Sequence, residues 1–311
     1  MQVSAVSTEH THPVFGGHEK FVFRQGWLKK GIDLVETDPT IFTRTDALVQ
    51  LGVGKNMVRS IRHWCLATGV LESSSGGHRS ALQATILGRK LFANNGWDPY
   101  LEDPGTLWLL HWQLVSDLYY GFLWHILFTR VVEREFTRQH LTEVIGRQLE
   151  RQGIQARPGT VEREVDVCLR TYVSGRMKSA ADSEDSLDCP LAELGIIRPT
   201  REERLYSFAI GPKPLLPTQI FGYALLHFLA QIAQHRRTVA VDESIYKPGS
   251  PGQAFKLDED SVVAYLESLE ELTSGDIRLN ETAGLKQIYL YTWPLDNVSD
   301  YALNLLQSYY E

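Results

Sequence analysis

The sequence predicts an α+β protein that is predominantly helical and opens with a winged helix-turn-helix. Two observations support this fold class. Residues 46–69 hold two short helical patterns separated by the turn Gly52-Val53-Gly54, and a strand–turn–strand pattern follows directly. Further along the chain, helical patterns alternate with short strand-like segments. We therefore expect a helical hub and further small winged-helix-like units after the first module.

The second of these helical patterns, over residues 55–66, has one apolar and one cationic side. Val58, Ile61 and Cys65 recur at i, i+3 and i+7, which places them on one helix face. The opposite face is expected to carry Lys55, Arg59, Arg62 and His63. A basic helix that follows a tight glycine turn is typical of DNA-binding helix-turn-helix proteins. The alternative is a winged helix that contacts only other proteins.

If this helix enters a major groove, the residues near its start reach the bases first. We therefore expect Asn56 and Arg59 to read the base sequence. Arg62 and His63 lie further along the helix and are expected to contact phosphates. The two pairs should differ in effect, because base contacts discriminate between sequences whereas phosphate contacts strengthen binding to all of them.

A short hairpin and a third helix are predicted after the helix-turn-helix. Residues 69–72 and 80–83 are strand-like, and the flexible turn between them has Arg79 at its basic tip. Thr85 stands at the N-cap position of a helix over residues 86–92. This order of elements is that of a winged helix, in which Arg79 would be a further DNA contact.

Residues 15–31 interleave aromatic side chains with cations. This pattern suits base stacking combined with phosphate contact. In the alternative, the aromatic residues pack onto the winged helix and the cations are solvated. The cations that would contact DNA are Lys20, Arg24, Lys29 and Lys30.

The same segment contains the only candidates for catalysis, His18 and Glu19. Glu19 would bind a metal ion, and His18 would act as a general acid or base, because an unperturbed imidazole has a pKa near 6.5. The hypothesis requires both side chains to lie in one cleft beside Lys55 and Arg59. A structural hydrogen bond between His18 and Glu19 is the alternative.

Four segments are expected along the chain. Residues 1–95 hold the N-terminal segment and winged helix, and residues 96–135 form an aromatic-rich hub with one buried helix that starts at Asp103-Pro104. Residues 136–217 resemble a second winged helix, with helices near 137–149 and 160–171 and strands over 191–197 and 206–210. Residues 218–311 combine helices, one of them capped by Asp258 or Asp260, with a hairpin over 277–292.

Several catalytic motifs can be excluded. A phosphate-binding loop needs glycine and then Ser or Thr where this chain has Val49 and Asn56, so no nucleotide cofactor is expected. No lysine follows a carboxylate by two residues, as restriction-type nucleases require, and Gln25 replaces the aspartate of phospholipase-like nucleases. Two acidic groups, Glu162 with Glu164 and Asp166, and residues 182–188, are interpreted as solvated faces rather than metal sites.

The composition indicates a soluble protein in a reducing compartment, and we expect it in the cytoplasm. The 311 residues are 43% hydrophobic and carry a net charge of -7, which argues against a protein that coats nucleic acid over its whole surface. Residues 107–128 are apolar but contain Asp117, which is costly inside a bilayer, so we expect no membrane span. The three cysteines are widely spaced and odd in number.

Long blocks of this sequence resemble a bacterial family with a domain of unknown function. The blocks are FGGHEKFVFRQGWLKKG, GVGKNMVRSIRHWCLATGVLE, DPYLEDPGTLWLLHWQL and the stretch from FKLDEDS to GLKQIYL, which together span residues 15–290. Members of this family occur with cysteine desulfurases and reductase-like ATP pyrophosphatases in DNA phosphorothioation systems. One such system contains a member that nicks DNA.

The resemblance implies a DNA-binding, and DNA-nicking, component of a phosphorothioation system that acts in phage defence. Its partners would be double-stranded DNA and the sulfur-transfer enzymes, and its cofactor would be Mg²⁺ or Mn²⁺. The family provides no active-site motif, so the metal ligands are not assigned, and the sequence leaves open whether the protein is a homodimer. A non-catalytic winged-helix adaptor or transcriptional regulator is the alternative function.

Overall fold

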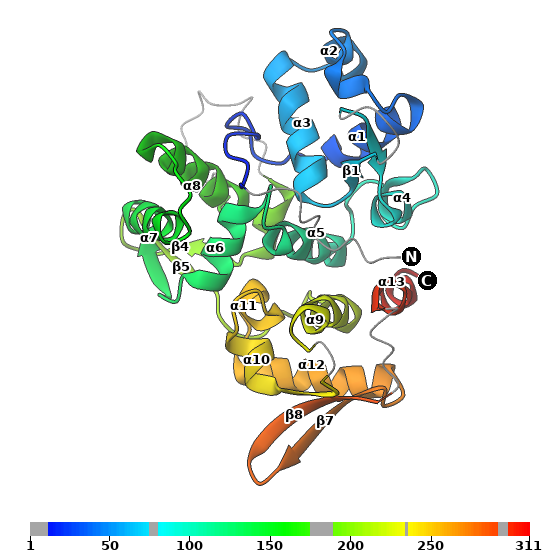
Figure 1. Ribbon diagram of the computed structural model, residues 1–311, viewed down its shortest axis with the longest axis vertical. Helices are drawn as coiled ribbons and strands as arrows, with labels where there is room; N and C mark the ends of the chain where they lie inside the picture. The colour runs from blue at the N-terminus through cyan, green and yellow to red at the C-terminus, as the bar shows by residue number, and fades with distance from the viewer. Residues whose placement is uncertain (1–11, 75–79, 175–188, 234–235, 292–297) are drawn as a thin grey trace. The chain divides into compact units, whose positions relative to one another are not determined.

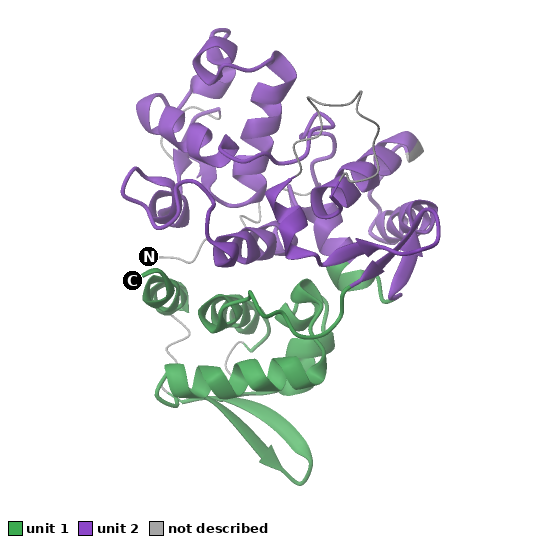
Figure 2. Ribbon diagram, turned by 180° about the vertical axis from the view of Figure 1, so that it is seen from behind, with its two compact units in different colours: residues 1–8, 128–132, 209–311 green, residues 9–127, 133–208 purple. Residues whose placement is uncertain are grey.

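The computed structural model describes residues 12–74, 80–174, 189–233, 236–291 and 298–311. The fold is α+β, with about 54% helix and small antiparallel sheets, as the sequence predicts. The chain forms two compact units (Figure 2). The larger unit holds the described residues of 9–127 and 133–208, and the smaller unit holds those of 128–132 and 209–311.

The larger unit begins with helices and a short hairpin (Figure 1). In chain order these elements are α1 (Trp27–Thr37), η1 (Ile41–Thr43), α2 (Ala47–Leu51), α3 (Lys55–Ala67), β1 (Leu71–Ser73), β2 (Leu82–Ala84) and α4 (Ile86–Phe92). Gly52 ends α2 in the left-handed conformation (φ +66°), and this accounts for the predicted turn before α3. The hydroxyl of Thr85 accepts a hydrogen bond from the backbone N–H of Gly88, so the predicted N-cap of α4 is confirmed.

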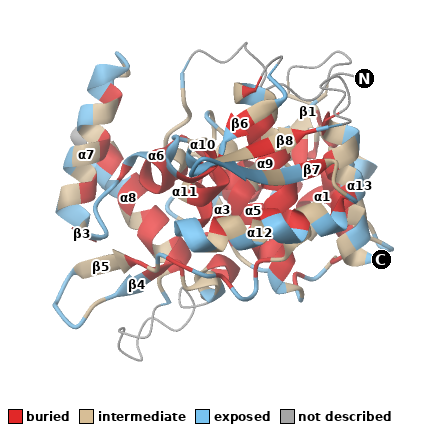
Figure 3. Cartoon of the chain, turned by 90° about the horizontal axis from the view of Figure 1, so that it is seen from below, coloured by how far each residue is buried: buried red, intermediate tan, exposed pale blue. Residues whose placement is uncertain are grey.

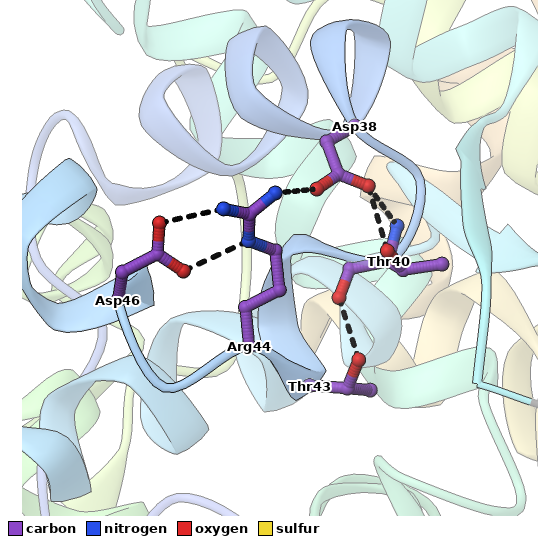
Figure 4. Close-up of polar contacts among 5 residues, drawn as sticks. All are labelled: Asp38, Thr40, Thr43, Arg44 and Asp46. Carbon is purple, nitrogen blue, oxygen red and sulfur yellow. Dashed lines mark hydrogen bonds and ion pairs between the residues drawn. The ribbon is translucent and has the colours of Figure 1, made fainter.

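A polar network stabilises the entry into α2 (Figure 4). The Arg44 guanidinium donates to both carboxylate oxygens of Asp46 at 2.8 Å and to Asp38 at 3.1 Å. Asp38 also accepts hydrogen bonds from the backbone N–H and hydroxyl of Thr40. Hydrogen bonds from Thr40 lower the pKa of Asp38, and the hydrogen bond from Arg44 lowers that of Asp46. Because Arg44 is neutralised by two carboxylates, it adds no net positive charge beside α3.

The single buried helix predicted after Asp103 is instead two helices, α5 (Pro104–Ser116) and α6 (Phe122–Arg130). The carboxylate of Asp117 accepts backbone hydrogen bonds from Tyr119 and Tyr120, which turns the chain out of α5. Gly121 completes the turn, because a Cβ there would lie only 2.0 Å from the carbonyl oxygen of Leu114. Asp103 does cap α5 as predicted, by accepting from the backbone N–H of Gly105.

The remainder of the larger unit is a helical pair with a three-stranded sheet. Its elements are β3 (Glu135–Thr137), α7 (Arg138–Arg151), α8 (Pro158–Tyr172), η2 (Pro190–Leu194), β4 (Ile197–Pro199) and β5 (Leu205–Phe208). Figure 3 shows α7 buried along one side, on which Leu141, Ile145 and Leu149 follow one another at helical spacing. The strand predicted over residues 191–197 is wrong for most of its length, because Pro190 starts a short 3-10 helix that Gly195 ends.

The smaller unit contains α9 (Thr218–Ile232), β6 (Thr238–Ala240), α10 (Val241–Tyr246), α11 (Pro251–Phe255), α12 (Glu259–Leu272), β7 (Ile277–Thr282), β8 (Leu285–Leu290) and α13 (Val298–Tyr310). Asp258 caps α12 by accepting from the backbone N–H of Ser261. Two buried lysines hold the backbone of this unit together. Lys213 donates to the carbonyl oxygens of Ala209, Gly211 and Lys256, and Lys256 donates to that of Phe128 at 2.7 Å.

The two three-stranded sheets have the same antiparallel topology. In each sheet the last strand in sequence lies in the middle, in the orders β3-β5-β4 and β6-β8-β7. In both cases two or three helices separate the first strand from the second. In its described residues the first module has the β1-β2 pair alone, but the backbone N–H of Leu82 in β2 also donates to the carbonyl oxygen of Pro39. Pro39 therefore takes the place that the first strand has in the other sheets.

Candidate nucleic-acid interface

Helix α3 has the amphipathic character that its sequence predicts. Val58, Ile61 and Cys65 are buried, and Ile61 and Cys65 have no exposed surface. The first turns of the opposite face are open to solvent, because Lys55, Asn56 and Arg59 are exposed, and Arg62 is partly exposed. α3 contains no acidic residue. The helix therefore presents positive charge from its N-terminal half.

His63 does not lie on this face, and its predicted contact with phosphate is wrong. Its side chain is buried, with an exposed fraction of 4%, and its ring makes edge contacts with the rings of His18, Trp64 and Tyr120. Burial lowers its pKa to about 3, so the imidazole is neutral at physiological pH. The buried face of α3 is wider than the spacing of its apolar residues indicates, because further segments of the chain pack against the helix.

The segment before α1 is one of these neighbours. Its residues 16–20 form a loop that contacts the basic helix α3, the basic-helix loop. His18 is buried. Its Nδ1 accepts from the backbone N–H of Lys20, and its Nε2 lies 3.1 Å from Oε2 of Glu164 on α8. Glu164 also accepts a hydrogen bond from the backbone N–H of Gly16. The buried carboxylate thus fastens this loop to α8.

The predicted pairing of His18 with Glu19 is wrong. His18 points into the core, whereas Glu19 points outward and pairs with Arg59 of α3 at 3.0 Å. Glu19 and Lys20 both adopt positive φ values, +48° and +69°, and this places successive side chains on different sides of the loop. A cleft that holds both His18 and Glu19, which the catalytic hypothesis requires, is therefore not formed.

The other cations of the N-terminal segment have different environments. The Arg24 guanidinium lies 5.7 and 5.6 Å from the ring centroids of Phe21 and Trp27. Lys29 bonds to Asp33, whereas Lys30 is exposed. Phe23 and Trp27 are buried, as expected if aromatic residues pack onto the helices rather than stack on bases. Arg79 lies outside the described residues.

Two residues of this region were not identified from the sequence. Glu164 was expected on a solvated face, but it is buried and binds the basic-helix loop. Arg170, which follows Glu164 further along α8, donates to the carbonyl oxygen of Lys20 at 2.8 Å. One local signal could have indicated that Glu164 is buried. It lies on α8 among Val161, Val165 and Cys168, which are buried at helical spacing.

The residues in the described ranges offer no cluster of three His, Cys, Asp or Glu side chains that could hold a metal ion. His18 and Glu164 are in contact, but no third ligand joins them, and both are buried. The acidic residues of 182–188 lie outside the described ranges. Mg²⁺ or Mn²⁺ therefore has no ligands assigned here. Among the described helices, none has both the length and the apolar composition of a membrane span.

Comparison with known proteins identifies close structural relatives. The family described as "Protein of unknown function (DUF4007)" matches residues 15–310. Two crystal structures of SspB resemble the chain with 31% sequence identity, covering 97% of this chain and 88% of SspB. Their TM-scores are 0.86, for SspB with a bound magnesium ion, and 0.84. No curated protein matches the sequence.

Proposed function

The chain belongs to the DUF4007 family, and from this membership and the surface of α3 we propose that it is a DNA-binding component of a bacterial phosphorothioation system. The likeness to SspB extends over nearly the whole chain, so the two proteins share their fold rather than a single motif. The family resemblance connects this fold with enzymes that place sulfur in the DNA backbone. Sulfur enters a backbone phosphate only after a protein has engaged the DNA at that position.

The observation that carries this proposal is the exposed cationic half of α3. Lys55 and Arg59 are exposed on a helix without acidic residues, in a protein whose net charge is -7. A local concentration of positive charge on an acidic body favours one specific contact with a polyanion over coating by it. Asn56, exposed beside them, has a side-chain amide that can make two hydrogen bonds to adenine.

The arrangement around α3 supports a winged-helix mode of binding. α2 and α3 follow each other across the Gly52 turn, and the antiparallel β1-β2 pair follows α3. In such modules the second helix of the pair enters the major groove, and its N-terminal residues contact base edges. We propose that Asn56 and Arg59 read bases and that Arg62 contacts phosphate. His63 has no part in this contact.

Nicking is the finer proposal, and it requires more than a binding helix. Hydrolysis of a phosphodiester proceeds by in-line attack, in which a divalent ion neutralises the developing negative charge. SspB has been crystallised with a magnesium ion, which supports the choice of Mg²⁺, or chemically similar Mn²⁺, as the ion to test. The alternative is an adaptor that holds the DNA while cysteine desulfurase and ATP pyrophosphatase partners act on it.

Relaxation of supercoiled plasmid by the purified full-length protein separates the two proposals. A nickase converts supercoiled plasmid to the open circular form when Mg²⁺ or Mn²⁺ is added, and EDTA stops the conversion. An adaptor retards the plasmid on a gel but leaves it supercoiled under every condition. A protein that neither relaxes nor retards the plasmid, at low salt and with both ions, would overturn the proposed function as a whole.

A further inference from the structure

We infer that the DNA surface continues from α3 across the basic-helix loop onto α8 and α7, so that the partner is a duplex longer than one helix-turn-helix half-site. This inference rests on the proposed DNA-binding function and adds a second region of contact to it. The residues that carry it belong to the larger unit. They form a strip of charged side chains, which in order are Arg59, Glu19, Lys20, Arg170, Asp166 and Arg138.

Contacts between successive residues make this strip continuous. Arg59 of α3 pairs with Glu19 at 3.0 Å, and Lys20 is the next residue of the loop. The guanidinium of Arg170 donates to the carbonyl oxygen of Lys20 at 2.8 Å. Figure 1 shows the loop lying between α3 and α8. The loop therefore places the cationic side of α3 next to the C-terminal half of α8.

The strip then crosses from α8 to the start of α7. Asp166 lies between two arginines, 3.5 Å from Arg170 and 3.7 Å from Arg138. All three side chains are well exposed, with exposed fractions of 40–51%. At these distances and exposures the ion pairs are weak, so a phosphate group can compete with the carboxylate for either arginine.

The strip has a net positive charge. Its four cations exceed its two carboxylates, Glu19 and Asp166, and Lys55 and Arg62 add further positive charge at the α3 end. Each carboxylate pairs with an exposed arginine, and a phosphate oxygen can make the same kind of contact. A planar guanidinium that is already paired loses little side-chain entropy when it exchanges a carboxylate for a phosphate.

Buried contacts beneath the surface connect the α3 end of the strip to its α8 end. The buried contact between Glu164 and His18 and the hydrogen bond from Gly16 fasten the loop to α8. The ring of His18 also touches that of His63 on α3, with centroids 5.7 Å apart. α3 and α8 are therefore bridged by packed side chains, and this arrangement favours a rigid, extended partner such as a DNA duplex over a flexible acidic peptide.

Binding to duplexes of two lengths tests the inference. We would compare the full-length wild type with Arg138→Ala, on duplexes of about 30 and about 12 base pairs, roughly three turns and one turn of B-DNA. Arg147→Ala is the matched control, because residue 147 is exposed on α7 nine positions from Arg138 and so on the opposite helix face. Arg59→Ala reports on α3 itself.

The inference predicts that Arg138→Ala weakens binding to the long duplex about three- to tenfold and lowers the salt dependence by about one phosphate contact. Binding to the short duplex, centred on α3, should match that of wild type, and Arg147→Ala should change neither. If Arg138→Ala behaves like Arg147→Ala on both duplexes while Arg59→Ala weakens both, the extension is wrong and the proposed function stands. If Arg59→Ala also has no effect, the α3 interface itself is wrong.

Discussion

Replacement of Glu164 by glutamine tests whether one buried carboxylate fixes the basic-helix loop to α8. The exposed fraction of Glu164 is 3%, and its two oxygens face the backbone N–H of Gly16 and Nε2 of His18. Because Nδ1 of His18 accepts a hydrogen bond from Lys20, its proton must be on Nε2. Both groups around the carboxylate are therefore donors.

The glutamine side chain has the same shape as glutamate but only one acceptor oxygen. In Glu164→Gln, the amide oxygen can serve either Gly16 or His18, and the amide nitrogen then faces the other donor. Loss of the carboxylate charge from this buried site, with a donor left facing the amide nitrogen, costs about 2–3 kcal/mol. Glu164→Ala removes both acceptors and leaves a cavity, so its cost should be larger, at about 3–5 kcal/mol.

Thermal unfolding followed by tryptophan fluorescence measures this loss in the larger unit, because residues 27, 64, 97, 108, 112 and 124, six of the seven tryptophans, lie there. For a unit of this size, each 1 kcal/mol lowers the unfolding temperature by about 2–4 °C, so Glu164→Gln should unfold roughly 4–12 °C below wild type. Glu162→Gln, at an exposed position of the same helix, is the control. Equal unfolding temperatures for the two variants would refute the reasoning.

Three further predictions follow from individual contacts. Gly88→Ala should destabilise the larger unit by about 1–3 kcal/mol, because its Cβ would lie 2.1 Å from the carbonyl oxygen of Val70. Gly146→Ala, in open space on α7, should instead stabilise the unit by about 0.5–1 kcal/mol. Urea unfolding measures both changes. The pKa of His63 is lowered to about 3, so below pH 6.5 the unfolded chain binds a proton that the folded chain does not. Stability should therefore fall by up to about 1.4 kcal/mol per pH unit from pH 6.5 downward, and urea titrations at pH 7 and 5 should show a smaller loss for His63→Phe. Glu19→Gln should raise duplex affinity about two- to fivefold, because it releases the arginine of α3, and an anisotropy titration that shows no change would place this pair outside the interface.

The sequence predicts correctly those features of the fold that are set by residues close together in the chain. The Gly52 turn, the amphipathic pattern of α3 and the N-caps Thr85, Asp103 and Asp258 are all set by side chains within a few positions of the element. The break between α5 and α6 was missed although Asp117 and Gly121 are visible in the sequence. The apolar run around them indicated a single helix, and turn chemistry prevailed over hydrophobic pattern there.

Long-range packing decided the environments that the sequence could not reveal. Gly16 and Glu164 are 148 positions apart, so nothing near either residue indicates that they bind each other. The same contact holds His18 in a buried position, whereas Glu19, its neighbour, is half-buried and faces Arg59. His63 is spaced as a surface residue of α3 but is covered by the loop and by Tyr120, which come from two distant segments. Charged residues at such junctions are misassigned because helical periodicity describes one helix at a time.

The central proposal, that α3 engages DNA, is tested most directly by the salt dependence of duplex binding. Fluorescence anisotropy titrations over a series of salt concentrations would compare wild type with Lys55→Ala/Arg59→Ala. A control variant, Arg147→Ala/Arg151→Ala, removes two exposed arginines from α7. The proposal predicts that the α3 variant binds every duplex more weakly and that its log–log salt slope is about 0.9 smaller than that of wild type, because Lys55→Ala removes one phosphate contact whereas Arg59→Ala removes a base contact. A slope and affinity equal to those of wild type, with the control unchanged, would contradict the assignment of α3 as the DNA-binding helix.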